Sequence, residues 1–170
     1  MKPARTTLVD PAAHSAPTFA DQDIIEWDED YAFNLRSQVL LSLEMVPHFI
    51  EQGGGKIINI ASMLSFQGGI LVPSYTSSKS AVAGLTRALA NEWAAYNINV
   101  NAIAPGYMAT ANTAPLRADE KRNAAILERI PAGRWGIPAD FGGPCVFLAS
   151  PASDYMHGSI VTVDGGWMGR

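Results

Sequence analysis

Short apolar runs that alternate with long helical patterns constrain the fold of this chain most. Residues 56–61 and 98–104 are compact runs rich in β-branched residues, which predict strands buried on both faces of a sheet. Apolar residues recur at helical spacing over 24–52 and over 74–96, which predicts two long helices, the first buried on more than one side. Strands separated by helices favour right-handed crossovers and a parallel sheet covered by helices. The predicted fold class is therefore α/β.

Weaker signals continue this pattern toward the C-terminus. The polar residues 117–129 predict a surface helix after a strand end, a position that suits a mobile flap. A further helix is predicted over 139–149 and a last strand over 159–163. The chain of 170 residues is 48% hydrophobic and 16% charged, which favours one globular domain. We expect this domain over residues 24–170, after an irregular segment over 1–23.

Charge and cysteine content exclude several classes of partner. The net charge is −4 and the 12 Lys and Arg residues are scattered, so the chain lacks the basic surface that nucleic acid requires. A single cysteine, Cys145, permits neither an internal disulfide nor a cysteine-based zinc site, and we read it as a small buried apolar residue. The sequence shows no signal peptide and no apolar run long enough to span a membrane. We expect a cytoplasmic protein without a metal site.

Tyr75 and Lys79 are the most informative pair of polar residues. Residues four apart share one face of a helix and can reach the same site. Ser62 follows the strand predicted over 56–61, so all three side chains are expected at the carboxyl edge of the parallel sheet, where such folds bind ligands. A nearby ammonium lowers the pKa of a phenol. We therefore expect Tyr75 to exchange a proton with a hydroxyl or carbonyl, with Ser62 bonded to the substrate oxygen.

These residues and the segments around them resemble the short-chain dehydrogenase/reductase family. The resemblance runs from Trp27 to Trp167 and includes the Ser62 strand end, Tyr75-x-x-x-Lys79, the strand over 98–103 and its Pro-Gly end, and the closing segment over 163–166. It implies the C-terminal part of a Rossmann-like, doubly wound parallel sheet. It also implies a fourth catalytic residue, Asn34, which holds a water that relays protons through Lys79.

The resemblance also implies the contacts of a nicotinamide cofactor. Tyr75 and Lys79 belong to this set, together with a loop that follows the second strand and contains Pro105, Gly106, Met108 and Thr110. We expect NAD, with NADP as the alternative. Family members pair through the two long helices, so a homodimer or homotetramer is expected by that route.

The amino-acid sequences of three segments resemble those of the sugar-acid dehydrogenases that act on 2-deoxy-D-gluconate or 2-dehydro-3-deoxy-D-gluconate. The expected activity is the interconversion of a secondary alcohol and a ketone on such a sugar acid. Ser62, Met63, Gln67 and Tyr107 are the candidates for substrate contacts. Arg117 and Arg134 could meet a carboxylate, but we expect both to be surface cations. A reductase of 3-oxoacyl thioesters is an alternative.

The glycine-rich phosphate loop of the family is missing from this sequence. Neither Gly-x-Gly-x-x-Gly nor Thr-Gly-x-x-x-Gly-x-Gly occurs in it. We therefore expect a chain that lacks the first strand-helix units of the fold, with one edge of its sheet exposed. The second reading of the sequence is accordingly a truncated, non-catalytic fragment or interaction protein that cannot hold the dinucleotide.

Overall fold

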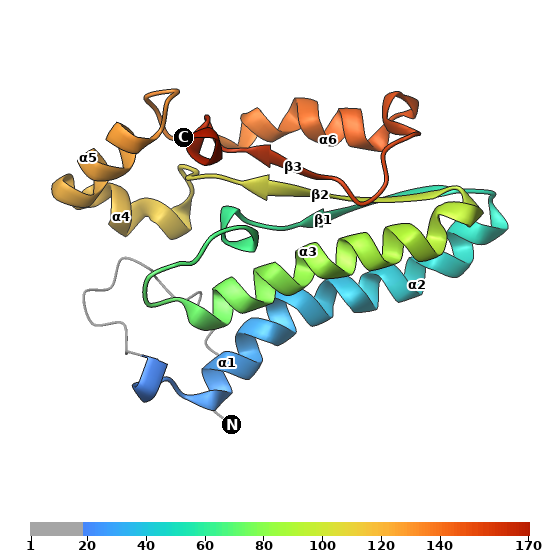
Figure 1. Cartoon of the computed structure of the whole chain (residues 1–170), viewed down its shortest axis with the longest axis horizontal. Coiled ribbons are helices and arrows are strands. Elements are labelled where there is room, and N and C mark those ends of the chain that lie inside the picture. The colour runs from blue at the N-terminus through green and yellow to red at the C-terminus, as the bar shows by residue number, and fades with distance from the viewer. Residues whose placement is uncertain (1–18) are drawn as a thin grey trace.

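The computed structural model describes residues 19–170, and its centre is a three-stranded parallel sheet. The strands are β1 (Gly55–Ile60), β2 (Ile98–Pro105) and β3 (Ile160–Val163), in the order β1-β2-β3. Helices α2 and α3 lie on one side of the sheet and α6 on the other (Figure 1). The predicted α/β class is confirmed. Most of the irregular segment predicted over 1–23 lies outside the described residues.

Six α-helices accompany the sheet within the described residues. They are α1 (Ile24–Tyr31), α2 (Ser37–Glu51), α3 (Pro73–Trp93), α4 (Ala114–Ala118), α5 (Glu120–Arg129) and α6 (Gly142–Ala149). A π-helical turn, Ala32–Arg36, joins α1 to α2, so the helix predicted over 24–52 is nearly continuous. Pro47 lies inside α2 and does not end it.

The core forms where β2 and α3 pack together. Every residue of β2 except Pro105 is buried, as expected for the middle strand of a sheet covered on both sides. Alternate residues of β2 pack against small and β-branched residues of α3, which lets the helix approach the sheet closely. The members of this core are Ala61, Val82, Ala90, Trp93, Ile98, Val100, Ala102 and Ala104.

Three predictions of burial are wrong. Cys145 is half-buried rather than buried, and the other two concern the outer edge of the sheet. Among residues 19–170, β1 pairs only with β2 and is half-buried along most of its length, with Ile60 49% exposed. The helices α1 and α2 expose much of their apolar surface because the sheet that these residues form has no strand beyond β1. The large apolar residues exposed on α1, α2 and the turn between them are Ile24, Ile25, Phe33, Leu40, Leu41, Leu43, Met45 and Ile50.

Helices α4 and α5 lie beyond the carboxyl ends of the strands (Figure 1). The single helix predicted over 117–129 is divided at Asp119, whose backbone is extended and whose side chain accepts a hydrogen bond from the amide of Arg122. Asp119 thus acts as the N-cap of α5, which satisfies a backbone donor that the helix itself cannot pair.

Within the part of the chain that the structure describes, no helix is both long enough and apolar enough to cross a membrane.

Candidate active site

Ser62 lies just past the carboxyl end of β1. Its backbone is extended, and its hydroxyl accepts a hydrogen bond from the amide of Leu64, so Ser62 caps a short 3-10 turn, Met63–Ser65. The hydroxyl of Ser65 in turn donates to the backbone carbonyl of Lys79, with 2.6 Å between the oxygens. This turn therefore fixes Ser62, which is 7% exposed, relative to α3.

Tyr75 and Lys79 lie in the first two turns of α3. Pro73 opens this helix at a position where its missing N–H costs nothing. The Ser62 side chain lies near enough to the Tyr75 phenol to lower its pKa, and the Lys79 ammonium lies 5.7 Å from the centre of the Tyr75 ring. The structure thus brings together the three residues that the sequence spacing placed at one sheet edge.

The pKa of Tyr75 is not lowered, although the sequence predicted that the nearby ammonium of Lys79 would lower it. It is raised above its usual value, mainly because the phenol is buried, and the negative charge of Asp30 raises it further. The Ser62 side chain acts in the opposite direction. The ammonium of Lys79 does not bring the Tyr75 pKa below its usual value. Burial lowers the pKa of Lys79 itself to about 8, and Lys79 donates a hydrogen bond to the Ile60 carbonyl, 2.9 Å away.

Asn34 is buried in the π-helical turn, and its carbonyl is linked to Lys79 through the side chain of Gln38 and the main chain of Ile60. The widened turn leaves the Asn34 carbonyl to accept a hydrogen bond from Gln38 Nε2 at 2.5 Å. Gln38 Oε1 accepts from the Ile60 amide at 2.9 Å, and the Ile60 carbonyl accepts from Lys79. Gln38 therefore connects Asn34 to the strand end that holds Lys79.

The predicted cofactor loop begins where β2 meets β3. Pro105 pairs with Val163, and the Gly106 amide donates to the Val163 carbonyl at 3.0 Å. A Cβ on Gly106 would lie 2.5 Å from the Asp164 backbone, so only glycine fits there. Farther along, Met108 is buried against Gly136, and Thr110 is exposed, its carbonyl accepting from Arg117. The loop is thus held by β3 at one end and by α4 at the other.

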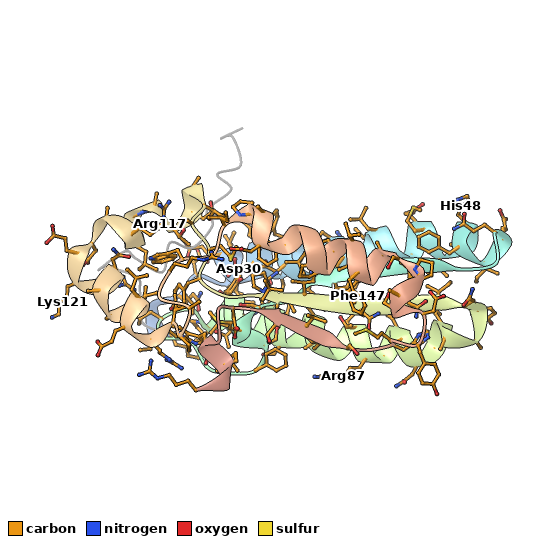
Figure 2. All side chains as sticks on the ribbon, turned by 90° about the horizontal axis from the view of Figure 1, so that it is seen from above. Asp30, His48, Arg87, Arg117, Lys121 and Phe147 are labelled. Atoms are coloured by element: carbon orange, nitrogen blue, oxygen red, sulfur yellow. The ribbon has the colours of Figure 1, made fainter. Side chains whose placement is uncertain are left out.

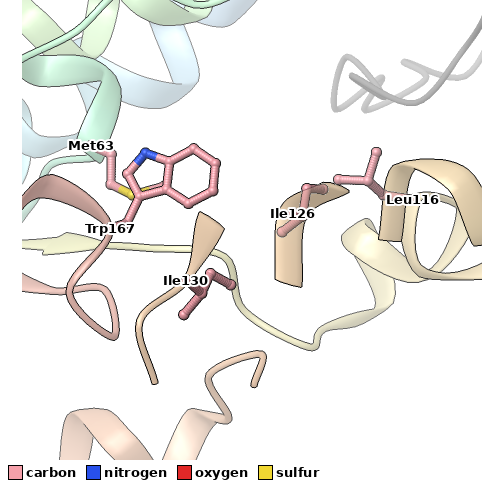
Figure 3. Close-up of a cluster of buried hydrophobic side chains, with 5 residues drawn as sticks. All are labelled: Met63, Leu116, Ile126, Ile130 and Trp167. Carbon is pink, nitrogen blue, oxygen red and sulfur yellow. The ribbon is translucent and has the colours of Figure 1, made fainter. Parts of the chain in front are cut away.

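The predicted substrate residues differ in their surroundings. Met63 is buried in an apolar cluster with Trp167 and residues of α4 and α5 (Figure 3). Tyr107 packs against the same cluster, with its ring centre 4.7 Å from that of Trp167. Gln67 is half-buried after the 3-10 turn that Ser62 begins. Met63 and Tyr107 therefore join the strand ends to the helices that cover them.

The two arginines that the sequence offered as carboxylate partners are engaged by the protein itself. Arg134 forms a bidentate ion pair with Asp140, at 2.8 and 2.9 Å. Arg117 donates to the carbonyl of Thr110 at 2.9 Å. A pocket at the ends of β2 and β3 is lined by Tyr107, Met108 and Arg134 among others, and Ser62, Tyr75 and Lys79 are not part of its lining.

Sequence reasoning missed three residues beside this cluster: Asp30, Gln38 and Ser74. Ser74 immediately precedes Tyr75 and is 1% exposed, and its hydroxyl donates to the buried carboxylate of Asp30. The sequence could have indicated Ser74, because it is a polar residue next to Tyr75 in a predicted helix. Asp30 carries no local signal, because its partner Ser74 lies 44 residues away in the sequence. The contact of Gln38 with the strand end spans 22 residues and has no local signal either.

The donor set fits one end of a nicotinamide dinucleotide. Among residues 19–170, the Lys79 ammonium has one hydrogen-bond acceptor, the Ile60 carbonyl, although it carries three donors. The remaining donors, beside a phenol and a serine hydroxyl, suit the hydroxyl groups of a ribose and a carbonyl oxygen. The sequence contains no glycine-rich loop for the phosphates, so the residues present fit the nicotinamide ribose and not the pyrophosphate.

A parallel α/β sheet with serine, tyrosine and lysine at its carboxyl edge defines a class, and comparison with known proteins identifies it. Residues 7–168 match a family model described as enoyl-(acyl carrier protein) reductase. The chain belongs to the short-chain dehydrogenase/reductase family. The predicted family membership is confirmed.

The chain is also similar in sequence to individual proteins whose activities are named. The chain is 65% identical to 2-dehydro-3-deoxy-D-gluconate 5-dehydrogenase of Escherichia coli, over 89% of this chain and 59% of the relative. The protein of that name from Dickeya dadantii is 61% identical, over 95% of this chain and 66% of the relative. The protein in a crystal structure from Agrobacterium tumefaciens with bound NADP is 55% identical in sequence to this chain. The two structures match with a TM-score of 0.88, over 91% of this chain and 63% of that one. The chain thus spans about three fifths of the length of these proteins.

Proposed function

We propose that this chain carries the catalytic part of a nicotinamide-dependent oxidoreductase that interconverts a secondary alcohol and a ketone on a sugar acid. The single observation that supports it most is the convergence of Ser62, Tyr75 and Lys79 at one strand end. The relatives named for 2-dehydro-3-deoxy-D-gluconate support that compound as the substrate.

Each residue has a role that follows from its surroundings. The hydroxyl of Ser62 hydrogen-bonds the substrate oxygen and orients the carbonyl toward Tyr75. Tyr75 gives its proton to that oxygen in the direction of reduction and removes it in the direction of oxidation. Lys79, held by the Ile60 carbonyl, directs its remaining donors to the ribose. A bound nicotinamide supplies or accepts the hydride.

The cofactor preference is part of the proposal. We expect NAD from the resemblance, whereas the Agrobacterium tumefaciens structure holds NADP, so both dinucleotides belong in the test. A homo-oligomer that pairs through the α2 and α3 faces and a cytoplasmic location remain predictions.

Titration with reduced dinucleotide tests the proposal directly. NADH and NADPH are added to the purified chain while cofactor fluorescence and the thermal midpoint are followed, and turnover of 2-dehydro-3-deoxy-D-gluconate is then assayed. The proposal predicts binding of one cofactor and turnover that Tyr75→Phe abolishes. An unchanged thermal midpoint and fluorescence at millimolar cofactor would favour the alternative, a non-catalytic fragment or interaction protein. Turnover of a 3-oxoacyl thioester alone would favour the other alternative.

A further inference from the structure

Asp30 is a buried carboxylate that the proposed chemistry does not use. It lies in the last turn of α1 and is 9% exposed. Along the long axis in Figure 2, Asp30 lies between Lys121, at the end formed by α4 and α5, and His48, near the opposite end. A buried carboxylate is costly unless its surroundings stabilise it, so its position calls for a physical reason.

One hydroxyl connects Asp30 to the active helix. Ser74 Oγ donates to Asp30 Oδ2 with 2.5 Å between the oxygens, and it accepts from Gln22 Nε2 at 3.1 Å. A hydrogen bond to a carboxylate is shorter and stronger than one between neutral groups. Because Ser74 directly precedes Tyr75, this contact fixes the first turn of α3 against the end of α1.

The charge on Asp30 has no cationic partner among residues 19–170. Its hydrogen-bond donor is the neutral hydroxyl of Ser74, and Lys56 and Arg134 are paired with other carboxylates, Asp154 and Asp140. The groups that face Tyr75 are Asp30 from α1, Lys79 from α3 and the neutral hydroxyl of Ser62 from the end of β1. Asp30 therefore supplies the negative charge that acts on the phenol, in the presence of the Lys79 ammonium 5.7 Å from the ring centre.

We propose that Asp30 is a positioning residue for Tyr75, which fixes the start of α3 through Ser74 and holds a negative charge beside the phenol so that Tyr75 rests as a proton donor. This inference rests on the proposed function. In reduction, the O–H bond of Tyr75 breaks, a new O–H bond forms on the substrate oxygen, and Tyr75 is left as a phenolate. A neighbouring carboxylate disfavours that phenolate and returns Tyr75 to its protonated form.

Nuclear magnetic resonance of the tyrosine ring tests this without cofactor or substrate. The chain is labelled with carbon-13 at tyrosine Cζ, and the signal of Tyr75, one of five tyrosines, is assigned with Tyr75→Phe. Asp30→Asn removes the charge and keeps a group that can accept from Ser74. The Tyr75 pKa should fall relative to wild type, because the charge that raises it is removed.

Two matched variants separate charge from position. Asp28→Asn removes the same charge from an exposed site on the same helix, and it should leave the Tyr75 pKa unchanged. Ser74→Ala removes the hydrogen bond and keeps the charge, so its Tyr75 pKa should stay closer to wild type than that of Asp30→Asn. It also supplies the test if Asp30→Asn does not fold: loss of the contact should then lower the thermal midpoint and broaden the Tyr75 signal.

A fall in the Tyr75 pKa that occurs only in Asp30→Asn supports the proposal. An unchanged Tyr75 pKa in Asp30→Asn, an equal fall in Asp28→Asn, or an unchanged signal and midpoint in Ser74→Ala would overturn it. Since the measurement needs no turnover, an inactive chain would count against the proposed function alone. In an active chain, the pH at which alcohol oxidation begins should move downward in Asp30→Asn by the same amount.

Discussion

The ammonium of Lys79 donates a hydrogen bond to the main-chain carbonyl of Ile60, with 2.9 Å between nitrogen and oxygen. This contact anchors the lysine to the last residue of β1, two residues before Ser62. It explains how a residue that is 6% exposed keeps its place beside Tyr75 without a carboxylate partner. The position of Lys79 is therefore set by the sheet as well as by the helix that carries it.

Burial of Lys79 should make stability depend on pH. Because the pKa of Lys79 is lowered from 10.5 to about 8 in the folded state, the unfolded chain binds more protons between these values. The free energy of unfolding should therefore rise with pH across this window. The gain relative to Lys79→Met should reach about 2 to 3 kcal/mol.

Urea unfolding at pH 7.5, 8.5 and 9.5 measures this difference. Lys121→Met, which removes an exposed lysine of α5, is the control and should keep the pH dependence of wild type. Parallel curves for wild type and Lys79→Met would show that Lys79 is not buried as described.

Gln38 should be needed for the strand end that holds Lys79. Gln38→Leu removes the partner of the Ile60 amide and of the Asn34 carbonyl, and each such hydrogen bond contributes about 0.5 to 1.5 kcal/mol. We expect a lower free energy of unfolding and faster hydrogen exchange at the Ile60 amide. Gln52→Leu, at an exposed position at the end of α2, should change neither quantity by a comparable amount. Equal exchange rates in wild type and Gln38→Leu would refute the link.

Two glycines should respond to alanine in opposite directions. Gly106→Ala places a Cβ 2.5 Å from the Asp164 backbone and should reduce the free energy of unfolding by about 1 to 3 kcal/mol. Gly84→Ala meets nothing within 4 Å inside α3 and should raise it by about 0.5 to 1 kcal/mol. Chemical unfolding of both variants in parallel checks the pair, and a neutral Gly106→Ala would contradict the close contact between β2 and β3.

The parts of the structure that the sequence predicted are those with strong local patterns. The predicted strand over 98–104 and helix over 74–96 match β2 and α3 closely, because complete burial selects continuous apolar runs in one and regular spacing in the other. The clustering of Ser62, Tyr75 and Lys79 followed from helical spacing and from the geometry of parallel strands. These relations are local or are imposed by the fold class.

The remaining features depend on contacts between distant segments. The π-helical turn around Asn34 does not alter the apolar period enough to be seen in the sequence. The pKa of Tyr75 is raised mainly by burial of its phenol, and the spacing of residues around Tyr75 does not reveal that burial. The contact between Asp30 and Ser74 joins residues 44 apart and has no local signal either. The exposure of the α2 face follows from the position of β1 at the sheet edge, which residue spacing within α2 does not reveal.

The central claim is that Ser62 and Tyr75 share one buried site, and titration of Tyr75 in Ser62→Ala tests it most directly. The Ser62 hydroxyl lowers the Tyr75 pKa in the folded protein, so its removal should raise that pKa further, as read from the carbon-13 signal of the ring. Ser80→Ala, an exposed serine later in the same helix, should have no effect. A Tyr75 pKa that is the same in wild type and Ser62→Ala would show that the two side chains do not meet.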